Sequence, residues 1–95
     1  MARYFVTRHR GAMDWALRAG IKAQQVAHLD VSTIARGDEV YGTLPVSLAG
    51  EVCQRGARYF HLTLDIPHGH RGAELSASDM DAMGASIEEY EVKKV

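Results

Sequence analysis

The sequence has few of the features that cross-link a chain or insert it into a membrane. Cys53 is the only cysteine, which excludes an internal disulfide and a cysteine-rich zinc site. No apolar run approaches the roughly 18 residues that span a bilayer. The apolar stretch after Arg3 is too short for a secretory signal and ends in Arg8-His9-Arg10. We therefore expect a cytoplasmic protein that makes no membrane contact.

The sequence also lacks a strong excess of either charge, which argues against general binding to long nucleic acids. The formal net charge is −1, but its distribution is uneven. Residues 1–36 are mainly basic, whereas residues 74–91 carry acidic side chains and neither Lys nor Arg. A focused basic site for a small anionic ligand fits this asymmetry better than a long nucleic-acid track. An acidic helix and strand that are merely solvated would explain the C-terminal part equally well.

A chain of 95 residues forms a single domain, residues 1–95. Its hydrophobic fraction of 46% is that of an ordinary globular protein. A domain this small buries roughly 60–65% of the surface of its unfolded chain, so its margin of stability is thin. Self-association would add to that margin.

Hydrophobic patterning predicts alternating strands and helices. The predicted strands are residues 4–7, 25–29, 39–43, 58–65 and 87–92, and the predicted helices begin near Ala12, Pro45 and Ser76 or Ser78. Strands separated by helices pair in parallel through right-handed crossovers. The expected fold class is therefore α/β: a Rossmann-like three-layer sandwich with a mostly parallel sheet and a half-exposed C-terminal strand at its edge.

In open sheets of this kind, ligands bind outside the carboxyl ends of the strands. The predicted ends are Arg8-His9-Arg10, Asp30, Thr43-Leu44-Pro45 and Asp65-Ile66-Pro67. We therefore expect most of the chemistry at these four turns. The loop of residues 66–72 could close over a ligand as a lid.

The first of these turns is a candidate anion site. A strand that feeds a helix leaves backbone N–H groups free at the positive end of the helix dipole. Arg8, Arg10 and the backbone of Gly11 would then contact a phosphate. The two arginines are alternatively plain surface residues.

His9 is the side chain best suited to proton transfer, because histidine changes its protonation near neutral pH. It could act as a base or as a donor to a phosphate oxygen, or it could simply cap the first helix. Arg8 would stabilise the charge that grows on the phosphate. We therefore assign catalytic roles to His9 and Arg8, and we expect neither a metal nor a cofactor.

Further candidate ligand contacts are Asp30, Thr43, Leu44 and Pro45. Asp30 either orients a group of the site or caps the next turn, and Thr43 is also a possible helix N-cap. His28 and His61 fall within predicted strands, which favours an interior position. Trp15 and Tyr41 are weak candidates for stacking on bases.

Several blocks of the sequence resemble one known family in order and spacing. These blocks are Thr7-Arg-His-Arg-Gly-Ala12, Val26-Ala-His-Leu-Asp30, Gly42-Thr-Leu-Pro-Val46 and Glu51-Val-Cys-Gln-Arg-Gly-Ala-Arg-Tyr59. They are similar to small CRISPR-associated proteins of the Csx type, which are found beside type III systems. The resemblance runs from about Tyr4 to Asp65 and continues loosely into residues 71–75.

The resemblance implies a fold related to CARF sensor domains, a homodimer and a role in antiviral defence. It also implies ring nuclease activity, which degrades the cyclic oligoadenylate messengers that activate type III defence nucleases. The ring size that best fits a two-fold dimer is cyclic tetra-adenylate. Cleavage needs no metal if a ribose 2′-OH is aligned with its own phosphorus, as in other RNA-cleaving lyases.

Two other functions remain open from the sequence. A non-catalytic protein could bind the same messenger, sequester it or pass on its signal. A small Rossmann-like protein could instead bind an unrelated phosphate ligand. His9 would serve a ring nuclease and a non-catalytic messenger-binding protein equally well, so the sequence does not separate these two functions.

Overall fold

The computed structural model describes residues 1–70 and 74–95. Along these residues the elements follow in the order β1 (Arg3–Val6), α1 (Arg10–Arg18), β2 (Gln24–Val26), the 3-10 turn η1 (Val31–Thr33), β3 (Glu39–Gly42), α2 (Val46–Gln54), β4 (Arg58–Thr63), the 3-10 turn η2 (His68–His70), α3 (Ala77–Ala82) and β5 (Ser86–Tyr90). The predicted lid at 66–72 includes Arg71 and Gly72, which lie outside the described residues.

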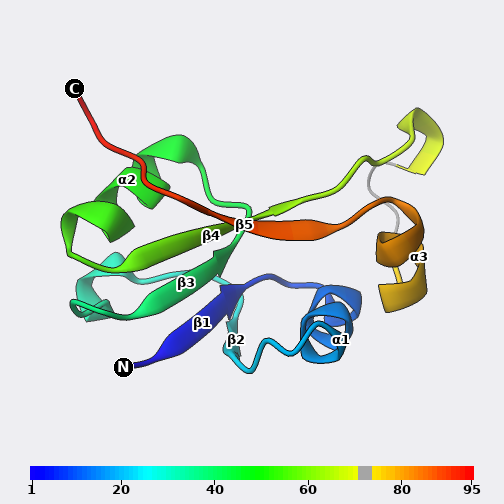
Figure 1. The fold of residues 1–95 in the computed structure, drawn as a ribbon, viewed down its shortest axis with the longest axis horizontal. Helices are drawn as coiled ribbons and strands as arrows, with labels where there is room; N and C mark the ends of the chain where they lie inside the picture. The colour runs from blue at the N-terminus through cyan, green and yellow to red at the C-terminus, as the bar shows by residue number, and fades with distance from the viewer. Residues whose placement is uncertain (71–73) are drawn as a thin grey trace.

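The strands form one sheet in the order β2-β1-β3-β4-β5. The pairs β1–β2, β1–β3 and β3–β4 are parallel, and β5 runs antiparallel to β4 at the edge (Figure 1). The predicted α/β class, with a mostly parallel sheet and the C-terminal strand at an edge, is confirmed.

Helices cover both faces of the sheet and create two apolar cores. On one face, α1 and α3 pack over a cluster that includes Phe5, Trp15, Ala16, Tyr41, Leu62 and Met80. On the other face, α2 packs over a cluster that includes Ile34, Val40, Ala49, Val52 and Tyr59. β4 contributes to both clusters, as its continuous apolar pattern predicts. The three-layer arrangement follows directly from these contacts (Figure 1).

The burial of two aromatic side chains corrects one sequence prediction. Trp15 is 6% exposed and its Nε1–H donates to Oδ1 of Asp81 at 2.9 Å. Tyr41 is 8% exposed and its hydroxyl donates to Oε1 of Glu39 at 2.6 Å. Both rings belong to the core beneath α1 and α3, so the interpretation of either as a base-stacking surface is wrong.

Two strands end earlier than the apolar patterns predict. β2 stops at Val26 instead of residue 29, because its partner strand β1 stops at Val6. The last hydrogen bond between them runs from the Thr7 N–H to the Val26 carbonyl at 2.9 Å. β4 stops at Thr63 instead of residue 65, because the Asp65 N–H is already engaged by the Met83 carbonyl at 2.9 Å. His28 therefore lies in a loop, and its assignment to a strand is wrong, whereas His61 lies within β4 as predicted.

The helix ends confirm one predicted N-cap and correct another. Gly20 follows α1 with φ 85°, a conformation that suits glycine after a helix. Ser76 caps α3 in a capping box with Asp79. Thr43 does not cap α2, because Pro45 is the N-cap residue and the Thr43 hydroxyl points to the Leu62 carbonyl at 3.4 Å.

Candidate functional site

The carboxyl ends of β1 and β3 lie side by side, and the connections that leave these two strands run in opposite directions across the sheet. From β1, the chain passes through α1 to β2 on one side; from β3, it passes through α2 to β4 on the other. Val6 pairs with Gly42 in this register, so the turns that follow the two strands lie next to each other. Such a topological switch point is where open α/β sheets bind ligands.

Gly42 allows the two strand ends to come close together. Its φ of 149° is a conformation that other residues rarely adopt. A Cβ at this position would lie 2.9 Å from the Val6 carbonyl oxygen. The glycine in the sequence block 42–46 therefore has a structural role at the switch point.

Arg8 lies immediately after β1 and connects this strand to the loop after β2. Its Nη2 group donates a hydrogen bond to Nε2 of His28 at 2.7 Å, and both side chains are exposed. Because arginine has no acceptor, Nε2 of His28 must accept this bond. The contact fixes the exposed guanidinium on the side of β1 that faces β2, beside the turn that the sequence predicts as an anion site.

His9 is the N-cap residue of α1 by position, but its imidazole faces the chain before α3. Its backbone N–H donates to Oγ1 of Thr7 at 3.1 Å, and its Nδ1 lies 3.2 Å from each carboxylate oxygen of Glu74. The side chain makes no capping hydrogen bond with the helix, so the interpretation of His9 as a simple cap is wrong. Its side chain is 61% exposed and accessible to a ligand.

The first turn of α1 packs against the segment that leads into α3. A Cβ on Gly11 would overlap the carbonyl oxygen of Leu75, so only glycine fits beneath this backbone. Gly11 is buried, whereas Arg10 beside it is exposed. The Cα of Gly11 thus faces protein, and a ligand role for its backbone stays a prediction.

The turn after β3 places the other predicted contacts beside the same switch point. Leu44 is buried, and its N–H donates to the Tyr59 hydroxyl at 2.9 Å, whereas Thr43 and Pro45 are exposed. Burial raises the pKa of the Tyr59 phenol, so its hydroxyl stays protonated near neutral pH. That hydroxyl also contacts Nδ1 of His61 and the Gly42 carbonyl oxygen, which makes the turn part of a hydrogen-bonded unit.

Asp30 caps the turn η1. Its Oδ1 accepts from the Ser32 hydroxyl at 2.6 Å and from the Ser32 N–H at 3.1 Å. These hydrogen bonds, first that of the hydroxyl and then that of the backbone, lower the pKa of the Asp30 carboxyl. Of the two roles that the sequence leaves open, the structure favours the cap.

Sequence reasoning missed two partners of the predicted site, His28 and Glu74. His28 reads as a strand residue until the early end of β2 is known, although it stands inside a block of the family resemblance. Glu74 lies 65 positions from His9, and nothing local in the sequence connects them.

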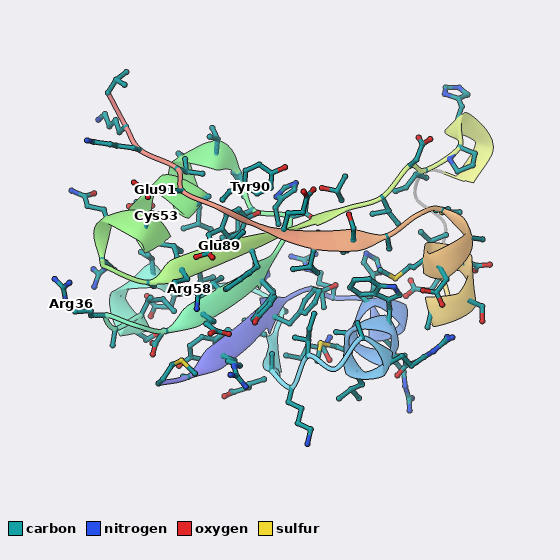
Figure 2. All side chains as sticks on the ribbon, viewed as in Figure 1. Arg36, Cys53, Arg58, Glu89, Tyr90 and Glu91 are labelled. Carbon is teal, nitrogen blue, oxygen red and sulfur yellow. The ribbon has the colours of Figure 1, made fainter. Side chains whose placement is uncertain are left out.

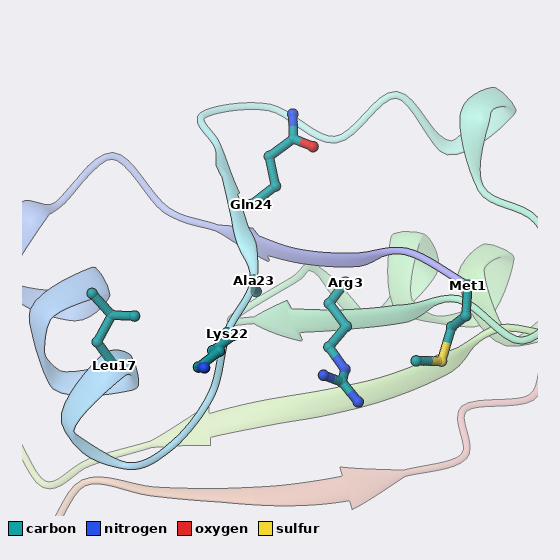
Figure 3. A pocket seen from close by; sticks show the side chains of 6 residues that line it. All are labelled: Met1, Arg3, Leu17, Lys22, Ala23 and Gln24. Atoms are coloured by element: carbon teal, nitrogen blue, oxygen red, sulfur yellow. The ribbon is translucent and has the colours of Figure 1, made fainter.

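Two pockets lie away from the switch point. One, lined by Met1, Arg3, Leu17, Lys22, Ala23 and Gln24, opens near the amino ends of β1 and β2 (Figure 3). The other lies between α2 and residues 89–95, and the ion-paired side chains of Arg58 and Glu89 are part of its lining (Figure 2). Neither contains a residue that the sequence nominates for catalysis or ligand contact.

In the part of the chain that the structure covers, no group of three or more His, Cys, Asp or Glu side chains is placed to hold a metal ion. No helix among residues 1–70 and 74–95 has the length and apolar character needed to cross a membrane.

The fold and the basic switch point define a Rossmann-like α/β protein with a candidate anion site at the ends of β1 and β3. A family model described as "Putative CRISPR-associated protein (Cas_VVA1548)" matches residues 4–93. The chain belongs to this CRISPR-associated family. No curated protein and no solved structure matches it significantly. Family membership agrees with the CRISPR association that the sequence blocks imply.

Proposed function

We propose that this protein is a ring nuclease that cleaves cyclic oligoadenylate, with cyclic tetra-adenylate as the preferred messenger. The observation that carries the proposal is the exposed pair Arg8 and His9 at the topological switch point, beside the turn Thr43–Pro45. Membership of a CRISPR-associated family supports a messenger of CRISPR defence as the anion. The proposal covers both the binding of the messenger at this site and its cleavage there.

The proposed active form is a homodimer. Cyclic tetra-adenylate has two-fold symmetry and four phosphodiesters. A two-fold dimer presents the same patch twice, so each subunit can hold half of the ring. In each subunit the exposed guanidinium groups of Arg8 and Arg10 would contact phosphates, each by charge-assisted hydrogen bonds.

Cleavage proceeds by in-line attack of a ribose 2′-OH on the adjacent phosphorus, without a metal. The 2′-oxygen forms a bond to phosphorus, its proton is accepted by a base, and the bond from phosphorus to the 5′-oxygen breaks. The 5′-oxygen takes a proton from water, which leaves a 2′,3′-cyclic phosphate and a 5′-hydroxyl. His9 supplies the proton-transfer group, and Arg8 stabilises the charge on the phosphate.

Alignment supplies the larger part of the rate in this mechanism, and proton transfer adds typically 10²–10⁴-fold. The position of His9 at the start of α1 suits both effects. The helix start offers backbone donors worth roughly 0.3–1 kcal/mol each to a nearby anion.

The test is incubation of the purified protein with cyclic tri-, tetra- and hexa-adenylate, with and without EDTA, and identification of the products by mass. We expect cyclic tetra-adenylate to be converted to linear products with a 2′,3′-cyclic phosphate, equally with EDTA present. Tight binding with the ring recovered intact would instead define a messenger-binding protein. Failure to bind any of the rings would overturn both and favour another phosphate ligand.

A further inference from the structure

We infer that Glu74 is a positioning residue that holds His9 with its proton on Nδ1 and leaves Nε2 free as the base. This inference rests on the proposed function of His9. It selects one of the two roles that the sequence leaves open, because a ring nitrogen without a proton accepts a proton and cannot donate a hydrogen bond.

The geometry of the pair sets the tautomer. His9 Nδ1 lies 3.2 Å from Oε1 and 3.2 Å from Oε2 of Glu74. An ionised carboxylate can only accept, so Nδ1 must carry the proton in this contact. In the neutral imidazole the other nitrogen, Nε2, then has a free lone pair. A carboxylate that fixes the tautomer of a histidine base is the arrangement used in Ser-His-Asp enzymes.

The backbone that follows Glu74 is held in place at two successive residues. Leu75, the next residue, packs its carbonyl against Gly11 in the first turn of α1. Ser76 follows and is fixed in the capping box of α3, where its hydroxyl accepts from the Asp79 N–H at 3.1 Å. The carboxylate is therefore presented to the residue that precedes α1, which is His9.

Because the His9–Glu74 pair is largely exposed, its effect on the orientation of the imidazole can be measured without a large change in the stability of the fold. The side chains of His9 and Glu74 are 61% and 70% exposed. Ion pairs this exposed contribute little to folding, so the loss of Glu74 should leave the fold intact. The competing explanation is that Glu74 only offers a negative charge to the start of α1. A measurement on the imidazole itself distinguishes the two.

The first test measures the tautomer of His9 by ¹⁵N chemical shifts of the imidazole, at about pH 8.5 where histidine is ordinarily neutral. We expect the Nδ1–H form in the wild type and loss of most of it in Glu74→Ala. Glu51→Ala, which removes an exposed charge from α2, serves as the matched control and should leave the His9 signals unchanged. The same tautomer in wild type and Glu74→Ala would overturn the inference, whether or not the protein cleaves RNA.

The second test measures cleavage of cyclic tetra-adenylate. Glu74→Ala should lower kcat by about 10-fold or more with little change in KM, since the base is misoriented but phosphate contacts remain. Glu74→Gln should recover part of the rate, because its amide oxygen still accepts from Nδ1–H. Unchanged kcat in an active protein would overturn the role of Glu74 and leave the proposed function standing. An inactive wild type would overturn the proposed function and leave the tautomer measurement to decide the rest.

Discussion

The Cα of Gly11 faces the carbonyl oxygen of Leu75 so closely that any side chain at position 11 would overlap it. This contact joins α1 to the segment before α3. It makes the spacing between the two helices depend on a residue without a side chain.

Gly11→Ala should therefore destabilise the protein by roughly 1–3 kcal/mol, because the added methyl must push backbone atoms apart. Gly50→Ala is a matched control in α2, since a Cβ there would lie at an ordinary 3.7 Å from Cγ1 of Val92. We expect it to stabilise by about 0.5–1 kcal/mol, because alanine favours a helix more than glycine does. Urea unfolding of both variants checks the two signs, and equal effects would contradict the close contact.

Arg8→Ala should weaken binding of cyclic tetra-adenylate by about 10-fold or more at low salt, where one charge-assisted hydrogen bond is worth roughly 1.5–3 kcal/mol. The difference from wild type should shrink as salt rises, because salt screens the phosphate charge. Arg36→Ala is the control: it removes the same charge from an exposed residue far from the switch point (Figure 2). Isothermal titration at two salt concentrations gives the comparison. Equal affinity of Arg8→Ala and wild type at low salt would argue against a phosphate contact.

His9→Ala should slow cleavage by about 10²-fold or more, because the proton-transfer group is lost. His9→Asn keeps a short polar side chain beside Glu74 but cannot transfer a proton, and we expect a similar loss. Thermal unfolding should show both variants folded, since the side chain is largely exposed. A rate within a few-fold of wild type, by the same mass assay, would remove His9 from the mechanism.

Asp38 should make the protein sensitive to acid. Its buried carboxylate accepts from the N–H groups of Ala2 and Ala35, each at 2.9 Å. These bonds, that of Ala2 first, lower the pKa of Asp38 below its ordinary value. A carboxyl whose folded pKa is depressed stabilises the fold above its unfolded pKa, near 4, and loses this contribution as the pH falls toward the folded pKa.

Asp38→Asn should thus be less stable than wild type at pH 7, and its stability should fall less between about pH 5 and pH 2. Asp14→Asn, an exposed carboxyl on α1, controls for the change in net charge. Thermal unfolding across this pH range is the measurement. Parallel curves for wild type and Asp38→Asn would contradict the assignment.

The order and type of the elements could be predicted from the sequence, because α1, α2 and β4 have strong local patterns. The apolar stripe of Ala12, Trp15 and Ala16 is buried against the sheet, and the continuous apolar run of β4 serves both cores. The strand ends could not be predicted, since they depend on where a neighbouring strand stops. For this reason the sequence pattern predicts a strand at His28, where the structure has a loop.

The candidate site was predictable only in part. Residues that follow β1 and β3 meet because parallel strands share one edge, and their sequence positions suffice to group Arg8, His9 and Thr43. Glu74 reaches His9 through the packing of α3 on α1, which no periodicity reveals. The side chain of Thr43 has the chemistry of a helix N-cap, but Pro45 occupies the N-cap position of α2. Residue type alone therefore predicts the wrong cap.

The acidic strand β5 limits how copies of this chain can assemble. Glu88 and Glu91 are exposed on or just after this border strand, and two such borders brought together would set like charges against each other. The opposite border, β2, is three residues long and offers little backbone to extend. A continuous sheet shared by two copies of this chain is therefore disfavoured, and variants that neutralise Glu88 and Glu91 carry a risk of uncontrolled strand addition.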